Sequence, residues 1–294
     1  MKKLINTGVI LLLLLGMTGC SNPPFLQSRG GAQSGGSQAQ SSAANTEASF
    51  SAAPSSEDAS SVPESQNPFV LSTVPAEDSQ ARQEALQQTK ATISTRVPLV
   101  LPADVPVVEG KYLAATTVSQ TWHYEADFFA ANQPAAVNSK EASQGTPLAV
   151  VKGTKYRNLA SAKDSIGYQQ VNLSAAKDFL VDLGHNIRAE EDAGCGHGYL
   201  NWNEGRWFLM MDYPNNPEYK NKTYPESEKL AQQIVAYLDS HMLPVPQKVG
   251  MVDIDNWNNN MGTIITWQDN QMVYQVTSRD PMIALQVAVA MKSK

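Results

Sequence analysis

The densest group of residues that could do chemistry lies in the segment from His185 to His197. His185, Asp192, Cys195 and His197 are all of the types that bind transition metals. If the segment enters a strand, Cys195 and His197 point to the same side of it, because side chains two residues apart share a face. The segment therefore predicts a candidate metal site made of these four residues. A polar, glycine-rich connection that leads into a strand at Tyr199 explains the same residues, and the spacing matches no standard zinc pattern.

Cys195 beside His197 is also the minimum needed for a thiol nucleophile with a general base. The sequence identifies no third group to orient the histidine, so we assign no catalytic residue. Ser174 and Lys177 match the Ser-x-x-Lys element of penicillin-binding proteins, but the Lys-Thr-Gly element is missing. The chain has no dinucleotide or Walker loop, no His-Glu-x-x-His and no Gly-x-Ser-x-Gly. These absences favour a protein that is not an enzyme and that carries no cofactor.

Trp257 stands between two carboxamides, Asn256 and Asn258. An indole ring with amide neighbours suits the apolar face and the hydroxyl groups of a sugar. The preceding Asp253 and Asp255 resemble the start of a calcium loop, but Trp257 stands where an oxygen ligand is required. We therefore predict ligand binding at Trp257, Asn256 and Asn258. The simpler alternative is that Trp257 covers the edge of a sheet.

Two similar segments in the second half of the chain indicate the elements that position these residues. Both read as apolar strand, tight turn and apolar strand, and they align as residues 198–211 and 262–276. Trp202 then matches Trp267, and Gly205 matches Asn270, which are residue types that tolerate the positive φ of a two-residue hairpin turn. A helix pattern follows each hairpin, first over 225–242 and then from an N-cap at Asp280.

This pattern predicts an α+β fold with a mostly antiparallel sheet. Two hairpin–helix units, which we interpret as a duplication, can share one sheet with both C-terminal helices packed on one face. A further strand is expected over 249–254. In the first half we expect a hairpin over 112–129, a strand over 148–151, helices over 160–166 and 174–183, and a strand over 168–173. The alternation typical of parallel βαβ units is absent.

Composition limits the possible partners. The 294 residues include 22 Lys and Arg against 28 Asp and Glu, which gives a net charge of −6. Such a chain carries no basic stripe, so we expect no binding to nucleic acid. Two cysteines exclude a disulfide framework. Hydrophobic residues make up 42% of the chain, which is enough for a packed core.

The first 96 residues divide into a leader and a linker. Two lysines and an apolar run over 9–15 resemble a signal peptide, and the run is too short to span a bilayer. Residues 21–66 are rich in Ser, Ala, Gln and Gly, which bury too little apolar surface to fold. A polar helix is possible over 81–94. We expect a signal peptide over 1–19, a flexible tether with its first Cys over 20–96, and an α+β domain over 97–294.

Met17-Thr18-Gly19-Cys20 resembles the cleavage box of bacterial lipoproteins. The resemblance implies that Cys20 is lipidated and becomes the first residue, so that acyl chains such as palmitate anchor the protein. The Ser/Ala/Gln/Gly tether is similar to that of many Gram-positive lipoproteins. The body resembles uncharacterised envelope lipoproteins of the Bacillota, which implies a location on the extracytoplasmic face of the cell membrane.

We therefore expect a membrane-tethered binding or accessory module of the cell envelope, whose partner is wall glycan or an envelope protein. The alternative is an extracytoplasmic metal-binding protein or hydrolase centred on the segment from His185 to His197.

Overall fold

The structure is a computed structural model that describes residues 76–258 and 262–291. The described residues belong to one compact unit, 66–294. The expected signal peptide, Cys20 and the first part of the expected tether lie outside the described residues. Among the residues described, no helix has both the length and the apolar character needed to cross a membrane.

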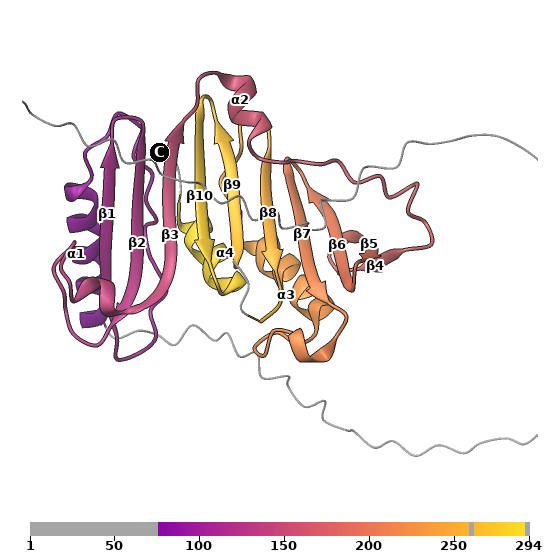
Figure 1. Ribbon diagram of the computed structural model, residues 1–294, viewed down its shortest axis with the longest axis horizontal. Coiled ribbons are helices and arrows are strands. Elements are labelled where there is room, and N and C mark those ends of the chain that lie inside the picture. The colour runs from indigo at the N-terminus through magenta and orange to yellow at the C-terminus, as the bar shows by residue number, and fades with distance from the viewer. Residues whose placement is uncertain (1–75, 259–261, 292–294) are drawn as a thin grey trace, which may run out of the picture. The chain divides into compact units, whose positions relative to one another are not determined.

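The described residues form a mixed α+β fold around one ten-stranded sheet, which runs from indigo β1 to the short β4 in Figure 1. The strand order is β1-β2-β3-β10-β9-β8-β7-β6-β5-β4. The strands are β1 (Tyr112–Gln120), β2 (His123–Ala131), β3 (Thr146–Lys155), β4 (Leu180–Asp182), β5 (Arg188–Gly194), β6 (His197–Glu204), β7 (Trp207–Pro214), β8 (Gly250–Asp255), β9 (Thr263–Asp269) and β10 (Met272–Ser278). The helices are α1 (Ala76–Thr92), α2 (Leu159–Asp164), α3 (Ser227–Ser240) and α4 (Pro281–Ala290), with short 3-10 turns at η1 (Ala142–Gln144) and η2 (Pro217–Tyr219).

The expected α+β class with a mostly antiparallel sheet is confirmed. Every pair of neighbouring strands is antiparallel except β7 and β8, which run parallel. Parallel neighbours need a crossover connection, and α3 supplies it between them. One βαβ unit is therefore present, although the sequence pattern indicated none.

Both expected hairpins in the second half form. Gly205 turns β6 into β7 and Asn270 turns β9 into β10, and both residues have positive φ (60° and 56°). Helix α4 begins after Asp280, whose carboxylate accepts hydrogen bonds from the backbone N–H groups of Met282 and Ile283. That the two hairpin–helix units arose by duplication stays a prediction.

Side chains alternate between two faces of the sheet. On the face that we call the core face, residues such as Leu209, Val252 and Ile265 join one hydrophobic cluster with buried residues of α1, α3 and α4. The intervening residues form what we call the outer face, which includes Met210, Asp253 and Ile264 in one cross-strand row. A second, smaller cluster at Ala162 and Ile166 packs with Val249 and Val273.

Helix α1 lies within the stretch that we expected to be flexible tether. It contacts β1, and Leu86, Thr89 and Ile93 are buried. Gln83 Nε2 also donates to the carbonyl of Ala103, at 2.9 Å. The folded domain therefore begins before the expected residue 97. A single large apolar residue in a polar helix gives a weak sequence signal, and the burial arises only from contact with the sheet.

Two smaller expectations in the middle of the chain were wrong. Residues 168–173 form no strand, and 174–183 form turns and the short strand β4 instead of a helix. The first hairpin forms as expected, with its turn at Thr121 and Trp122.

Candidate functional site

The four residues of the expected metal site do not come together. His185 lies in the turn before β5, where its Nδ1 is 3.2 Å from Asp239 of α3. His197 begins β6, and its Nδ1 is 2.6 Å from Asp212 of β7. The two histidines flank opposite ends of β5, which is 7 residues and so roughly 23 Å long at about 3.3 Å per residue. Within the described ranges no three His, Cys, Asp or Glu side chains are arranged to hold a metal ion.

Asp192 and Cys195 lie near His197 at the same end of the sheet. Asp192 is exposed on β5, opposite Tyr199 of β6. Cys195 is exposed in the tight turn between β5 and β6, with a φ of 54°. The turn therefore brings Asp192 and Cys195 near His197, but the three side chains are not arranged to bind one metal ion.

An aromatic cluster brings together two residues that the sequence analysis assigned to different sites. The rings of His197 and Trp257 meet edge to face, with 4.6 Å between centroids and 88° between planes. Tyr199 stacks with His197, with 6.4 Å between ring centroids and 22° between planes. We call the rings of His197, Tyr199 and Trp257, together with the Asp212 carboxylate that contacts His197, the aromatic cluster. It occupies the end of the outer face where β6 starts and β7 and β8 finish.

Backbone contacts fix Trp257 over this end of the sheet. Its neighbour Asn256 donates its backbone N–H to the carbonyl of Asp212 at 2.8 Å, and Trp257 itself forms an isolated antiparallel bridge with Lys220. The Trp257 side chain is partly buried. The alternative that Trp257 covers a sheet edge therefore describes part of its role, because the ring lies over His197.

The two asparagines beside Trp257 hold the loop in place. Asn256 is only 2% exposed, and its Nδ2 donates to the carbonyl of Tyr224 and to Ser227 Oγ, each at 3.0 Å. The backbone N–H of Asn258 donates to the carbonyl of Tyr219. The ligand set of Trp257, Asn256 and Asn258 stays a prediction, and the structure adds His197 as the direct ring neighbour of Trp257.

Carboxylates surround the aromatic cluster. Asp212 lies directly across from Asp255 in the parallel β7–β8 pair, and Asp253 precedes Asp255 on the same face. Burial, followed by the charges of Asp255 and Asp212, raises the pKa of Asp253 to about 6. Burial, followed by the charges of Asp212, Cys195 and Asp192, raises the pKa of the Tyr199 hydroxyl. This end of the outer face is therefore acidic and keeps Tyr199 protonated.

A second polar network on the outer face was missed by the sequence analysis. Lys152 Nζ of β3 is 3.0 Å from Glu125 of β2, and Asp127 accepts a hydrogen bond from Thr116 of β1. Burial and the neighbouring Glu125 raise the pKa of Asp127 to about 6. Burial opposes ionisation of Glu125, but Lys152 and Asp127 hold the pKa of Glu125 below its ordinary value. The sequence signal of this network is weak. Its two carboxylates alternate along β2, and their partners Thr116 and Lys152 come from two other strands, β1 and β3.

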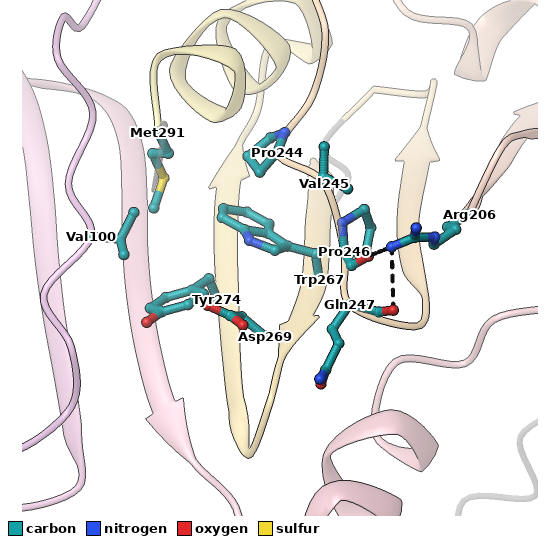
Figure 2. Close-up of a pocket in the computed structure, with 10 residues that line it drawn as sticks. All are labelled: Val100, Arg206, Pro244, Val245, Pro246, Gln247, Trp267, Asp269, Tyr274 and Met291. Atoms are coloured by element: carbon teal, nitrogen blue, oxygen red, sulfur yellow. Dashed lines mark hydrogen bonds between the residues drawn. The ribbon is translucent and has the colours of Figure 1, made fainter. Parts of the chain in front are cut away.

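A cavity of about 250 Å³ lies at the opposite end of the sheet, on the core face. Figure 2 shows the rings of Trp267 and Tyr274 between Val100 and Met291 on one side and the segment 244–246 on the other. The remaining lining residues are Arg206, Gln247 and Asp269. The cavity has no signal in the sequence, because its lining residues come from segments that are far apart in the chain.

No protein-family model, curated protein or solved structure matches this chain. The function therefore has to be argued from the chain's own residues.

Proposed function

We propose that this protein is a lipid-anchored module of the bacterial cell envelope that binds wall glycan through the aromatic cluster, without catalysing a reaction. The anchor is Cys20, and the location is the extracytoplasmic face of the cell membrane. The aromatic cluster is the observation that carries the glycan-binding part of the proposal.

The anchoring part rests on the amino-terminal sequence. Two or more acyl chains on Cys20 give stable attachment, whereas one chain gives only marginal binding. The net charge of −6 argues against attachment through anionic headgroups, which would repel the chain. A lipid anchor therefore accounts for membrane attachment where charge would not.

The geometry of the aromatic cluster suits a saccharide. Indole and phenol rings offer flat apolar surface to the C–H faces of a sugar, and their polar tips remain able to hydrogen bond. Asp212 fixes the orientation of the His197 ring through Nδ1, so Nε2 is the imidazole atom directed elsewhere. Carboxylates accept hydrogen bonds from sugar hydroxyls, and Asp212 and Asp192 lie near the Tyr199 hydroxyl.

The rest of the fold fits a binding role. In this proposal both C-terminal helices, α3 and α4, pack on the core face and leave the outer face for the partner. The acidic end of that face would repel a phosphate backbone, which supports the expectation of no nucleic-acid binding. An envelope protein that docks on the same face is the competing partner.

The geometry does not favour the alternative of a metal protein or hydrolase centred on His185, Asp192, Cys195 and His197. Each histidine has its own carboxylate partner, and β5 holds the two histidines at its opposite ends. A single reaction centre cannot use both.

Sedimentation with isolated peptidoglycan tests the glycan part. We expect the full chain with Cys20→Ser to be retained, and Trp257→Ala to weaken retention by roughly thirtyfold, equivalent to about 2 kcal/mol. Trp122→Ala is the matched control, because Trp122 is 43% exposed in the turn between β1 and β2, far from the cluster. Retention no greater than that of a tether-only peptide, or equal loss in both tryptophan variants, would contradict glycan binding at the cluster.

Metabolic labelling with an alkyne fatty acid tests the anchor separately. We expect label on the wild-type chain and none on the Cys20→Ser variant, with the variant released from the membrane fraction. A full-length amino terminus without acylation would contradict this part of the proposal and leave the glycan test unaffected.

A further inference from the structure

One end of the sheet combines cations with exposed apolar side chains. Figure 1 shows the β1–β2 turn, the end of β3 and α2 together at this end. We use the name basic edge for the exposed or partly exposed side chains of Arg96, Trp122, Lys155, Arg157, Leu159 and Lys163.

We propose that the basic edge docks on an anionic phospholipid surface, which directs the aromatic cluster at the other end of the sheet away from the membrane. The inference rests on the proposed location at the cell membrane. It gives that location an orientation, with the proposed glycan site towards the wall.

Backbone hydrogen bonds bring segments that are distant in the chain together at the basic edge. The N–H of Arg96 donates to the carbonyl of Thr121 at 2.9 Å. The N–H of Lys155 donates to the carbonyl of Trp122, also at 2.9 Å. The side chains meet as well, because Lys155 Nζ lies 4.2 Å and the Arg96 guanidinium carbon 5.7 Å from the centroid of the Trp122 ring. One indole and two cations therefore lie at one place on the surface.

Helix α2 extends the basic edge beyond the end of β3. Its first turn is held by a capping box between Asn158 and Ser161. Gln268 Nε2 of β9 donates to the carbonyl of Leu159 at 3.2 Å, which attaches the start of the helix to the sheet. Arg157 just before the helix and Lys163 in its last turn are both exposed.

The four cations of the basic edge are not neutralised within the protein. None of them takes part in an ion pair with another described residue. The turn, the end of β3, α2 and the neighbouring β9–β10 turn contain two carboxylates, Asp164 and Asp269. The edge therefore carries a net positive charge, although the chain as a whole is acidic.

The acidic end of the sheet is too distant to cancel this local charge. The strand registers place the start of β7 at the same end of the sheet as the end of β3. Strand β7 has 8 residues and is about 26 Å long at about 3.3 Å per residue, with Asp212 near its far end. Exposed charges are largely screened beyond about 8 Å at physiological ionic strength. The charge of the basic edge, and not the net charge of −6, therefore decides how this end meets an anionic surface.

The apolar side chains favour a lipid surface over a soluble polyanion. Trp122 is 43% exposed and Leu159 is 50% exposed. Tryptophan is enriched at the level of the lipid headgroups, and Lys and Arg can lay their apolar stems along the surface while their charged ends remain in water. A polyanion in water offers partners to the cations but no apolar medium for Trp122 and Leu159.

The expected strength of this contact suits orientation rather than attachment. Each Lys or Arg close to an anionic membrane strengthens binding by about fivefold. The proposed acyl anchor at Cys20 would hold the chain near the membrane, so that a weak second contact is enough to select one orientation.

Co-sedimentation with phospholipid vesicles tests the docking, using the chain from residue 20 onward with Cys20→Ser, which carries neither leader nor acyl chain. We expect it to bind phosphatidylcholine vesicles with about one third phosphatidylglycerol at least about tenfold more tightly than pure phosphatidylcholine vesicles. Arg157→Gln combined with Lys163→Gln should weaken binding by about twentyfold. Lys140→Gln combined with Lys222→Gln removes the same charge from exposed positions in loops at the opposite end and should leave binding unchanged.

The apolar contribution is tested with two tryptophan variants. Trp122→Ala should weaken vesicle binding by about tenfold and Trp257→Ala should leave it unchanged, which is the reverse of the pattern expected with peptidoglycan. Unchanged vesicle binding of Trp122→Ala, together with displacement of the chain by soluble polyphosphate, would show that the edge binds an anionic polymer and would overturn the proposal.

Equal binding to the two kinds of vesicle would also overturn it, as would equal losses in the two charge variants. The vesicle comparison uses unsubstituted side chains at the edge, so it stays decisive if a variant fails to fold. Its failure would leave the acylation and peptidoglycan tests unaffected.

Discussion

Replacing Asp253 by asparagine should stabilise the folded protein at neutral pH and leave its stability nearly unchanged near pH 4. The Asp253 carboxyl is largely buried on the outer face, and its Oδ1 has no hydrogen-bond partner in the described part of the chain. Burial, with the charges of Asp255 and Asp212, raises its pKa from 3.8 to about 6. The folded protein therefore holds the proton of the Asp253 carboxyl more tightly than the unfolded chain does.

The sign of the effect follows from this difference in proton affinity. Below the unfolded pKa the carboxyl is protonated in both states and the full stability is present. As the pH rises through the folded pKa, the folded state must lose a tightly held proton, so stability is lost between about pH 4 and pH 7. A shift from 3.8 to about 6 corresponds to at most about 3 kcal/mol, and partial exposure reduces this to about 2 kcal/mol. Asparagine cannot ionise and avoids that loss.

Urea unfolding of the wild-type chain and of Asp253→Asn at several pH values between about 4 and 8 measures the effect. We expect the free energies of unfolding to agree near pH 4 and to differ by about 2 kcal/mol at pH 7, which is equivalent to about 4–8 °C in Tm. Glu141→Gln, at an exposed carboxylate, serves as the control. A difference that is independent of pH, or a variant that becomes the less stable protein as the pH rises, would refute the burial argument.

Three further substitutions test the packing and the local structure, with the free energy of unfolding as the measurement in each. Ile234→Ala should cost about 2–5 kcal/mol, because Ile234 of α3 is fully buried in the main core cluster, and a cost below about 1 kcal/mol would contradict that packing. Asp280→Ala should cost about 0.5–2 kcal/mol through loss of the α4 N-cap, whereas Asp280→Asn should restore most of it. Gly153→Ala should destabilise the β2–β3 pair by about 1–3 kcal/mol, because an added Cβ would overlap the ring of Tyr124, and a neutral result would show that this ring can move.

The hairpins and the start of α4 in the second half of the chain could be predicted from sequence, because the patterns that indicate them are local. A glycine and an asparagine that tolerate positive φ mark the turns at 205 and 270, and an aspartate followed by proline marks the start of α4. Each signal depends on the conformational preference of one or two residues, so neighbouring elements have little influence on it.

Helix α1 shows where such local reasoning fails. Its side chains are mostly polar, and the sequence offered Leu86 as its single large apolar residue before Ile93. The helix is held by burial of Leu86 and Thr89 against the sheet and by the Gln83 contact with Ala103. These partners are distant in sequence, so composition alone assigned the segment to the tether.

For the candidate sites too, sequence identified single residues but not which of them lie together. The sequence identified His197 and Trp257 as residues with chemical potential, because their types are informative at any position. It could not show that they face each other, since β6 and the end of β8 become neighbours only through the intervening β7. For the same reason it grouped His185 with His197, which β5 holds apart.

The sequence by itself determined the residue types, the tight turns, the α4 cap and the acidic charge, all of which depend on short stretches of chain. The tertiary structure decided the strand order, the parallel β7–β8 pair, the aromatic cluster and the cavity beside Trp267. These features join side chains from segments that are far apart in the chain. Their energies come from burial and pairing between elements, which no local pattern encodes.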